Sequence, residues 1–172
     1  MKYLFLGDSI TEGFNVKSFL PEYDIDNKGV SGDSTIETLS LIGSIDFSIS
    51  YDKIFLCIGT NDLARKRSIK EIGANIVKIV TLLHEKTPNS KIFVHSIFPT
   101  RENSPRPIET ILRLNVTILS LSYTYNFNFI NSFFCFTDED TQLKEEFTED
   151  GLHLTNLAYK TWADIIRQYL EN

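Results

Sequence analysis

The feature that most constrains the fold is an alternation between short, continuous apolar runs and longer stretches with helical periodicity. The apolar runs occupy residues 3–6, 54–58, 92–94 and 127–130. Runs of this length without polar alternation are typical of strands that are covered on both faces, as in a parallel sheet. A more polar stretch, residues 23–27, follows Pro21, and we expect it to form an edge strand.

Helical stripes lie between and after these runs, with apolar residues at steps of three and four over residues 69–83, 108–119 and 158–169. Ser68 and Glu71 have the spacing of a capping box at the start of the first stripe. This alternation predicts one domain over residues 1–172, an α/β protein built as a three-layer α/β/α sandwich with right-handed crossovers. Residues 99–107 contain three prolines and are expected to form a loop.

Charge and apolar content exclude several classes of partner. The chain of 172 residues has 17 basic and 23 acidic residues, a net charge of −6, which argues against general binding to nucleic acid or to an anionic lipid surface. No apolar run approaches the roughly 20 residues of a membrane span, and the start of the chain does not resemble a secretory signal. These features predict a cytoplasmic protein.

The histidines and cysteines outside the motifs described below give no sign of a metal or cofactor. His84 and His95 have no partners at metal-ligand spacing, and the acidic run 138–140 lacks the Gly and terminal Glu of a calcium loop. We expect these to be surface features. Cys57 and Cys135 are far apart in the sequence and are expected to be buried free thiols.

The tripeptide Gly-Asp-Ser follows the first predicted strand and ends at Ser9. Open α/β sheets bind their ligands at this carboxyl edge, and a serine nucleophile there needs a base, a group that orients the base, and donors for an oxyanion. The same tripeptide occurs again and ends at Ser34, where Glu37 completes the spacing of a capping box. We interpret Ser34 as a helix cap and Ser9 as the candidate nucleophile.

Two further segments supply partners for Ser9. Asn61 lies in the sequence Gly-Thr-Asn-Asp directly after the run 54–58, where its side-chain amide could donate to an oxyanion, although such a sequence alone is ordinary turn chemistry. Asp150 and His153 are three residues apart before the last helical stripe. At that spacing a carboxylate can hold one imidazole nitrogen so that the other accepts the serine proton.

Together, in this order, these segments resemble the SGNH or GDSL family of hydrolases. The matching blocks are GDSITEG at 7–13, NKGVSGD at 27–33, GTND at 59–62 and DGLHL at 150–154. The resemblance implies a flavodoxin-like five-stranded parallel sheet in the order 2-1-3-4-5, with Ser9 as nucleophile, His153 as base and Asp150 as its partner. It also implies an oxyanion hole formed by the backbone amides of Ser9 and Gly32 and by the side chain of Asn61, with no cofactor.

The predicted activity is hydrolysis of carboxylic esters of a small molecule through an acyl-enzyme, with a short acyl group such as acetyl on a polar molecule or carbohydrate. Asp8, Arg65 and Arg101 are candidate substrate contacts, and Arg106 shares the proline-rich loop with Arg101. The alternatives are a lysophospholipase or thioesterase that acts on longer acyl chains, an acyltransferase, and a non-catalytic carbohydrate-binding module. The oligomeric state is left open by the sequence.

Overall fold

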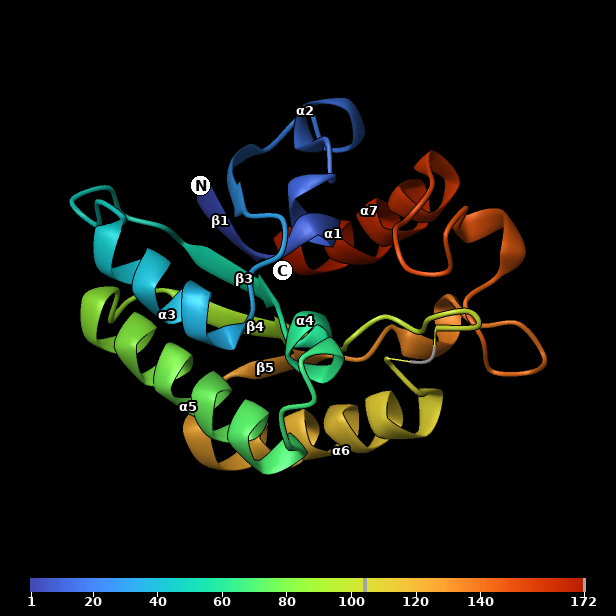
Figure 1. The fold of residues 1–172 in the computed structure, drawn as a ribbon. Coiled ribbons are helices and arrows are strands. Elements are labelled where there is room, and N and C mark those ends of the chain that lie inside the picture. Colours follow the sequence, from blue (N-terminus) through green and yellow to red (C-terminus); the bar gives the residue numbers. More distant parts are fainter. Residues whose placement is uncertain (104, 172) are drawn as a thin grey trace.

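Five parallel strands form the centre of the computed structural model, which describes residues 1–103 and 105–171 (Figure 1). The strands are β1 (Lys2–Gly7), β2 (Asp24–Gly29), β3 (Lys53–Cys57), β4 (Lys91–His95) and β5 (Asn128–Ile130). Their order in the sheet is β2-β1-β3-β4-β5, so the predicted fold and strand order are confirmed. The polar strand lies at an edge, as expected. The predicted loop 99–107 includes Ser104, which lies outside the described residues.

Helices cover both faces of the sheet and produce the predicted three layers (Figure 1). One face is covered by α3 (Thr35–Ser44), α5 (Ile69–Lys86) and α6 (Ile108–Tyr125), and the other by α1 (Ser9–Glu12), α2 (Val16–Phe19) and α7 (Asn156–Leu170). The capping boxes that begin with Ser34 and Ser68 both form. Like α1 and α2, three further short elements were not expected from periodicity: α4 (Thr60–Ala64), η1 (Phe133–Cys135) and η2 (Glu145–Phe147).

The core is divided between the two faces by the pleat of each strand. In β3, Ile54 and Leu56 pack under α3, α5 and α6, whereas Phe55 and Cys57 face α7. On the α7 side the ring of Trp162 stacks against Phe14 with their centroids 4.6 Å apart. Because every residue of β3 is buried, the apolar run that follows Lys53 is explained by helices on both sides.

Two expectations about single residues are wrong. His95 is buried at the end of β4, where Ser132 Oγ and the carbonyl oxygen of Ser96 lie within hydrogen-bond distance of its ring nitrogens. Burial lowers the pKa of His95 to about 4, so the ring is neutral at physiological pH. Cys135 is exposed in η1, whereas Cys57 is buried as expected.

The register of the strands brings three loops to the same edge. Gly7 at the end of β1 pairs with Gly29 of β2 on one side and with Cys57 of β3 on the other. A side chain at Gly29 would place its Cβ 2.2 Å from the backbone nitrogen of Glu12, so glycine allows β2 to approach α1 closely. The segments that follow these three strands therefore meet at the carboxyl edge of the sheet.

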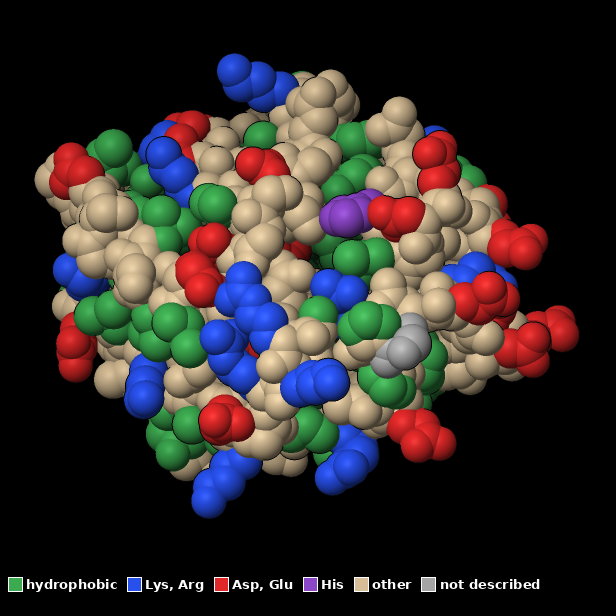
Figure 2. Space-filling view, in the orientation of Figure 1, with side chains coloured by type: hydrophobic (Ala, Val, Ile, Leu, Met, Phe, Trp, Pro, Cys, Tyr) green, Lys and Arg blue, Asp and Glu red, His purple; other side chains and the backbone are tan. Residues whose placement is uncertain are grey.

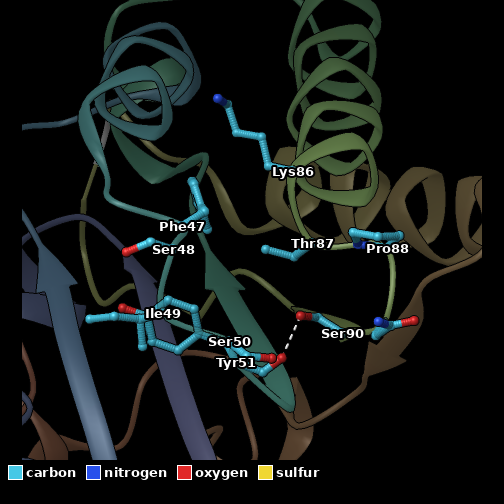
Figure 3. A pocket seen from close by; sticks show the side chains of 10 residues that line it. Phe47, Ser48, Ile49, Ser50, Tyr51, Lys86, Thr87, Pro88 and Ser90 are labelled. Atoms are coloured by element: carbon cyan, nitrogen blue, oxygen red, sulfur yellow. Dashed lines mark hydrogen bonds between the residues drawn. The ribbon is translucent and has the colours of Figure 1, made fainter.

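A separate surface pocket lies at the opposite edge, beside the amino ends of β3 and β4 (Figure 3). It has a volume of about 110 Å³ and is lined by the segments 47–51 and 86–90. Ser90 Oγ donates a hydrogen bond to the carbonyl oxygen of Tyr51 across it, and Lys86 lies over the ring of Phe47. The pocket is thus remote from the loops that carry Ser9 and its candidate partners.

Candidate active site

Three side chains from the two ends of the chain form a continuous hydrogen-bonded row at the carboxyl edge of the sheet. Ser9 Oγ lies 3.0 Å from His153 Nε2, and His153 Nδ1 lies 2.6 Å from Asp150 Oδ2. Ser9 is the first residue of α1, and His153 lies three residues before α7. In this arrangement the imidazole can accept the proton of the serine hydroxyl while the carboxylate fixes its tautomer.

The loop 148–153 holds Asp150 and His153 together through local bonds. Asp150 Oδ1 accepts hydrogen bonds from the backbone N–H groups of Leu152 (2.9 Å) and His153 (2.8 Å). Although partial burial acts to raise it, hydrogen bonds from the His153 side chain and from these backbone groups lower the pKa of Asp150 to about 2. Asp150 is therefore a carboxylate throughout the neutral range and can stabilise a positively charged imidazole.

Gly151 anchors this loop to the segment after β4. Its φ is +81°, and a Cβ there would lie 2.2 Å from the carbonyl oxygen of Arg101. The backbone N–H of Arg101 in turn donates to the carbonyl oxygen of Gly151 at 2.8 Å. Glycine is required at this position both for the left-handed backbone and for the close approach.

Ser9 is positioned by Asp8, which is the N-cap of α1. Asp8 Oδ1 accepts a hydrogen bond from the backbone N–H of Ile10 at 3.0 Å. The Asp8 residue is only 2% exposed, and burial raises its pKa to about 7 against the opposing effects of the Ile10 N–H, His153 and Arg106. Asp8, which the sequence suggested as a substrate contact, is thus buried next to Ser9.

Asn61 and Gly32 come from the loops that follow β3 and β2. Asn61 lies in α4, and its Nδ2 donates to the carbonyl oxygen of Asp33 at 2.8 Å, while its Oδ1 accepts from Arg106 Nη2 at 3.1 Å. Gly32 has a φ of +82°, and its carbonyl oxygen accepts a hydrogen bond from Arg65 Nη2 at 2.8 Å. The two loops are therefore bonded directly to one another.

A buried ion pair ties α3 and α4 together beneath these loops. Asp62 is fully buried, and its carboxylate accepts hydrogen bonds from the backbone N–H of Thr35 (2.9 Å), from Thr35 Oγ1 (2.6 Å) and from Arg67 Nη1 (2.9 Å). A buried carboxylate needs this number of partners to offset its lost hydration. Sequence reasoning found Asp62 only as part of a motif and did not anticipate its structural role.

The arginines expected to contact substrate are already engaged with the protein. Arg65 pairs with Glu37 at 2.9 Å, and Arg101 pairs with Asp138 and donates from Nε to the carbonyl oxygen of Leu143. The Arg101 guanidinium therefore points to the loop 138–143. Arg106, the other arginine of the proline-rich loop, donates from Nη2 to Asn61 Oδ1.

The surface around the site has mixed charge. A histidine lies beside an acidic side chain, and Lys and Arg side chains gather a short distance away on the same face (Figure 2). Among the described residues, no group of three or more His, Cys, Asp and Glu side chains is arranged to hold a metal ion. None of the helices in the described part of the chain combines the length and apolar character needed to cross a bilayer.

Comparison with known proteins gives consistent matches over nearly the whole chain. The model of the GDSL-like Lipase/Acylhydrolase family matches residues 5–161. A solved structure from Streptococcus pneumoniae, described as a candidate platelet activating factor, is 31% identical with a TM-score of 0.94, covering 98% of this chain and 83% of the other.

A curated human protein and a second solved structure are also similar to this chain. Human platelet-activating factor acetylhydrolase IB subunit alpha2 is 27% identical over 98% of this chain and 77% of its own length. The structure of an acetyl-xylooligosaccharide esterase mutant from Geobacillus is similar in fold, with a TM-score of 0.75 and 19% identity over 97% of this chain and 92% of the other.

Proposed function

The chain belongs to the GDSL-like lipase/acylhydrolase family, and from this we propose that it is a serine esterase that hydrolyses small carboxylic esters through an acyl-enzyme on Ser9. The observation that carries the proposal is the 3.0 Å contact between Ser9 Oγ and His153 Nε2, with Asp150 held against the other ring nitrogen. A serine hydroxyl in contact with an oriented imidazole is the arrangement that acyl transfer requires.

In the first step, Ser9 Oγ attacks the ester carbonyl carbon while His153 Nε2 accepts the hydroxyl proton. The tetrahedral intermediate collapses as the imidazolium returns this proton to the leaving alcohol. Water then attacks the acyl-enzyme with His153 again acting as base, which releases the acid and restores Ser9. Asp150 stays ionised and stabilises the imidazolium in both steps because its pKa is held at about 2.

The oxyanion of each tetrahedral intermediate would be bound by three N–H donors. These are the backbone amides of Ser9 and Gly32 and the side-chain amide of Asn61. The bond from Asn61 Nδ2 to the Asp33 carbonyl uses one of the two amide hydrogens and leaves the second for substrate. Loss of one such donor reduces kcat by about 100- to 1000-fold in a comparable serine hydrolase.

We further propose that the acyl group is short, with acetyl as the first candidate. The names of two relatives, a platelet-activating factor acetylhydrolase and an acetyl-xylooligosaccharide esterase, both specify removal of acetyl groups. The alcohol is proposed to be a small polar molecule or a carbohydrate.

The test is steady-state hydrolysis of p-nitrophenyl esters with acyl chains from two to twelve carbons. Wild type should show its highest kcat/KM with acetate, and Ser9→Ala should abolish turnover. Ser40→Ala, which removes an exposed hydroxyl from α3, is the matched control and should retain wild-type rates. Highest activity on the longest chains would contradict the short-acyl proposal, and turnover by folded Ser9→Ala would refute the serine mechanism.

Two other functions predict different results in this assay and in a measurement of ligand binding. An acyltransferase would form more transfer product than free acid when an alcohol acceptor is added to the p-nitrophenyl acetate reaction. A carbohydrate-binding module would bind its ligand equally well as wild type and as Ser9→Ala and would show no turnover of any ester.

A further inference from the structure

Arg106 contacts the acceptor end of the Asn61 side-chain amide, whereas Asp33 contacts its donor end. We propose that Arg106 is a positioning residue that fixes the orientation of the Asn61 side-chain amide, so that an N–H and not the carbonyl oxygen faces the substrate. This inference rests on the proposed function, because it assigns Arg106 a role through an oxyanion donor of that reaction.

An asparagine amide has a donor end and an acceptor end of almost the same shape, and only the donor end can stabilise an oxyanion. Here the two ends have different partners. Asn61 Oδ1 accepts from Arg106 Nη2 at 3.1 Å, and Nδ2 donates to the carbonyl oxygen of Asp33 at 2.8 Å. A flipped amide would place Oδ1 against the Asp33 carbonyl and its NH₂ group against the guanidinium. Both neighbours therefore select the same orientation.

The guanidinium is itself held in place by several bonds. Arg106 Nε donates to the carbonyl oxygen of Thr60 at 3.1 Å, and Nη1 donates to Asn103 Oδ1 at 3.2 Å. Two adjacent residues of α4 thus accept from one edge of the guanidinium. This geometry suits the planar fork of arginine, which presents several N–H groups in fixed directions, and it does not suit the single ammonium of lysine.

The backbone of Arg106 is also constrained. Pro105 and Pro107 flank it, and a residue before proline is restricted to extended conformations. The carbonyl oxygen of Arg106 accepts a hydrogen bond from Thr100 Oγ1 at 2.9 Å. The backbone that carries the side chain is therefore fixed before the guanidinium binds α4.

The charge of Arg106 has a second effect on the site. Burial lowers the pKa of the guanidinium, but the nearby carboxylates of Asp8 and Asp150 oppose this, and arginine stays charged at neutral pH. A charged donor on Oδ1 polarises the Asn61 amide and strengthens the N–H that remains for the oxyanion. Arg106 thus both orients and polarises the Asn61 amide, and both effects stabilise the transition state.

Arg106 also lines a pocket of about 350 Å³ together with residues such as Glu102, Ile108 and Gln142. A direct contact with substrate in that pocket would change KM, whereas a role through Asn61 would change kcat. The neutral substrate p-nitrophenyl acetate separates these cases, because it offers no anionic group for the guanidinium to bind.

The experiment measures kcat and KM on p-nitrophenyl acetate for Arg106→Met, Arg106→Lys, Asn61→Ala and the double variant Asn61→Ala/Arg106→Met. We expect Arg106→Met to lower kcat by about 10- to 100-fold, less than the about 100- to 1000-fold loss for removal of a whole donor, with KM nearly unchanged. Arg106→Lys should be intermediate. The double variant should be no slower than Asn61→Ala alone, because the arginine then has nothing to position.

Arg113→Met, which removes an exposed arginine from α6, is the control and should match wild type. Melting temperatures of all variants report whether each remains folded. The proposal is overturned if Arg106→Met lowers kcat by the same factor in the Asn61→Ala background as in wild type, or if its effect lies in KM. An unchanged kcat in Asn61→Ala would show that Asn61 is not an oxyanion donor and would overturn the proposal for Arg106. Turnover by Ser9→Ala would instead refute the proposed function.

Discussion

Replacement of the buried Asp8 by asparagine should change how the stability of the protein depends on pH. Asp8 is 2% exposed, and burial raises its pKa from 3.8 to about 7. Asparagine has nearly the same shape and can accept the same hydrogen bond from the backbone N–H of Ile10, so the N-cap of α1 is preserved. The variant therefore removes the ionisation of Asp8 and leaves the cap in place.

The change in unfolding free energy with pH follows from the difference between the pKa values of Asp8 in the folded and unfolded states. Because the pKa of Asp8 is higher in the folded state, the protonated carboxyl favours folding below about pH 4, and this contribution is lost as the pH rises through about 7. A shift of about 3 pKa units corresponds to about 4 kcal/mol of unfolding free energy. The stability of Asp8→Asn relative to wild type should therefore rise by about 4 kcal/mol between pH 4 and pH 8 and should be constant above that.

The assay is urea unfolding at one-unit pH steps from 4 to 9, followed by the fluorescence of Trp162, which is the single tryptophan of the chain and is buried. Other groups that titrate, such as His95, are common to both proteins and cancel in the difference. Asp140→Asn, which removes an exposed carboxyl, is the control and should give a curve parallel to wild type. Parallel curves for Asp8→Asn and wild type would refute the reasoning.

Three further outcomes are expected. Asp150→Asn should lower kcat on p-nitrophenyl acetate by about 10,000-fold with the melting temperature retained, because the imidazole loses its oriented tautomer. A loss of less than about 10-fold would contradict this. The pKa of His95 is lowered by burial to about 4, so the neutral ring contributes its full stability above pH 6.5 and less as the pH falls to 4. Over this range the unfolding free energy of wild type in urea should decline by about 3 kcal/mol more than that of His95→Gln. Identical pH profiles for the two proteins would contradict this. Arg67→Met leaves the buried Asp62 carboxylate without its counter-ion and should lower the unfolding free energy by about 3 kcal/mol, whereas an unchanged urea midpoint would show that the pair contributes nothing.

Much of the fold could be predicted because burial on both faces leaves a clear pattern in the sequence. The apolar run 54–58 and the stripe 69–83 correspond to β3 and α5. By contrast, α1, α2 and α4 have only four or five residues each. A helix of one turn has too few residues to display a period of 3.6, so its presence depends on caps and tertiary contacts that the sequence does not reveal.

The candidate site was predictable where its parts are local in sequence or follow a strand. Asp150 and His153 are three residues apart, and Ser9 and Asn61 each come just after a strand at the same sheet edge. The roles of Asp62 and Arg106 were not predictable. Arg106 meets Asn61 across 45 positions of sequence, and only the docking of the proline-rich loop on α4 brings them together.

The burial and the partners of single polar residues were also not predictable from the sequence. His95 continues an apolar strand, but a polar ring in that position can lie inside only if partners exist for both nitrogens, and those partners lie on Ser96 and Ser132. Arg101 shows the reverse case, because a cation expected to contact substrate is paired with Asp138. In both residues the outcome depends on a neighbour that the sequence alone does not identify.

The central claim is that Ser9 is an activated nucleophile, and covalent labelling tests it most directly. The folded protein is treated with a fluorophosphonate probe, and the mass of the intact chain and of its peptides is measured. We predict one adduct per chain, located on Ser9, with labelling lost in Ser9→Ala and strongly slowed in His153→Ala. A folded wild-type protein that gains no adduct, or an adduct on another serine such as Ser34, would contradict the account.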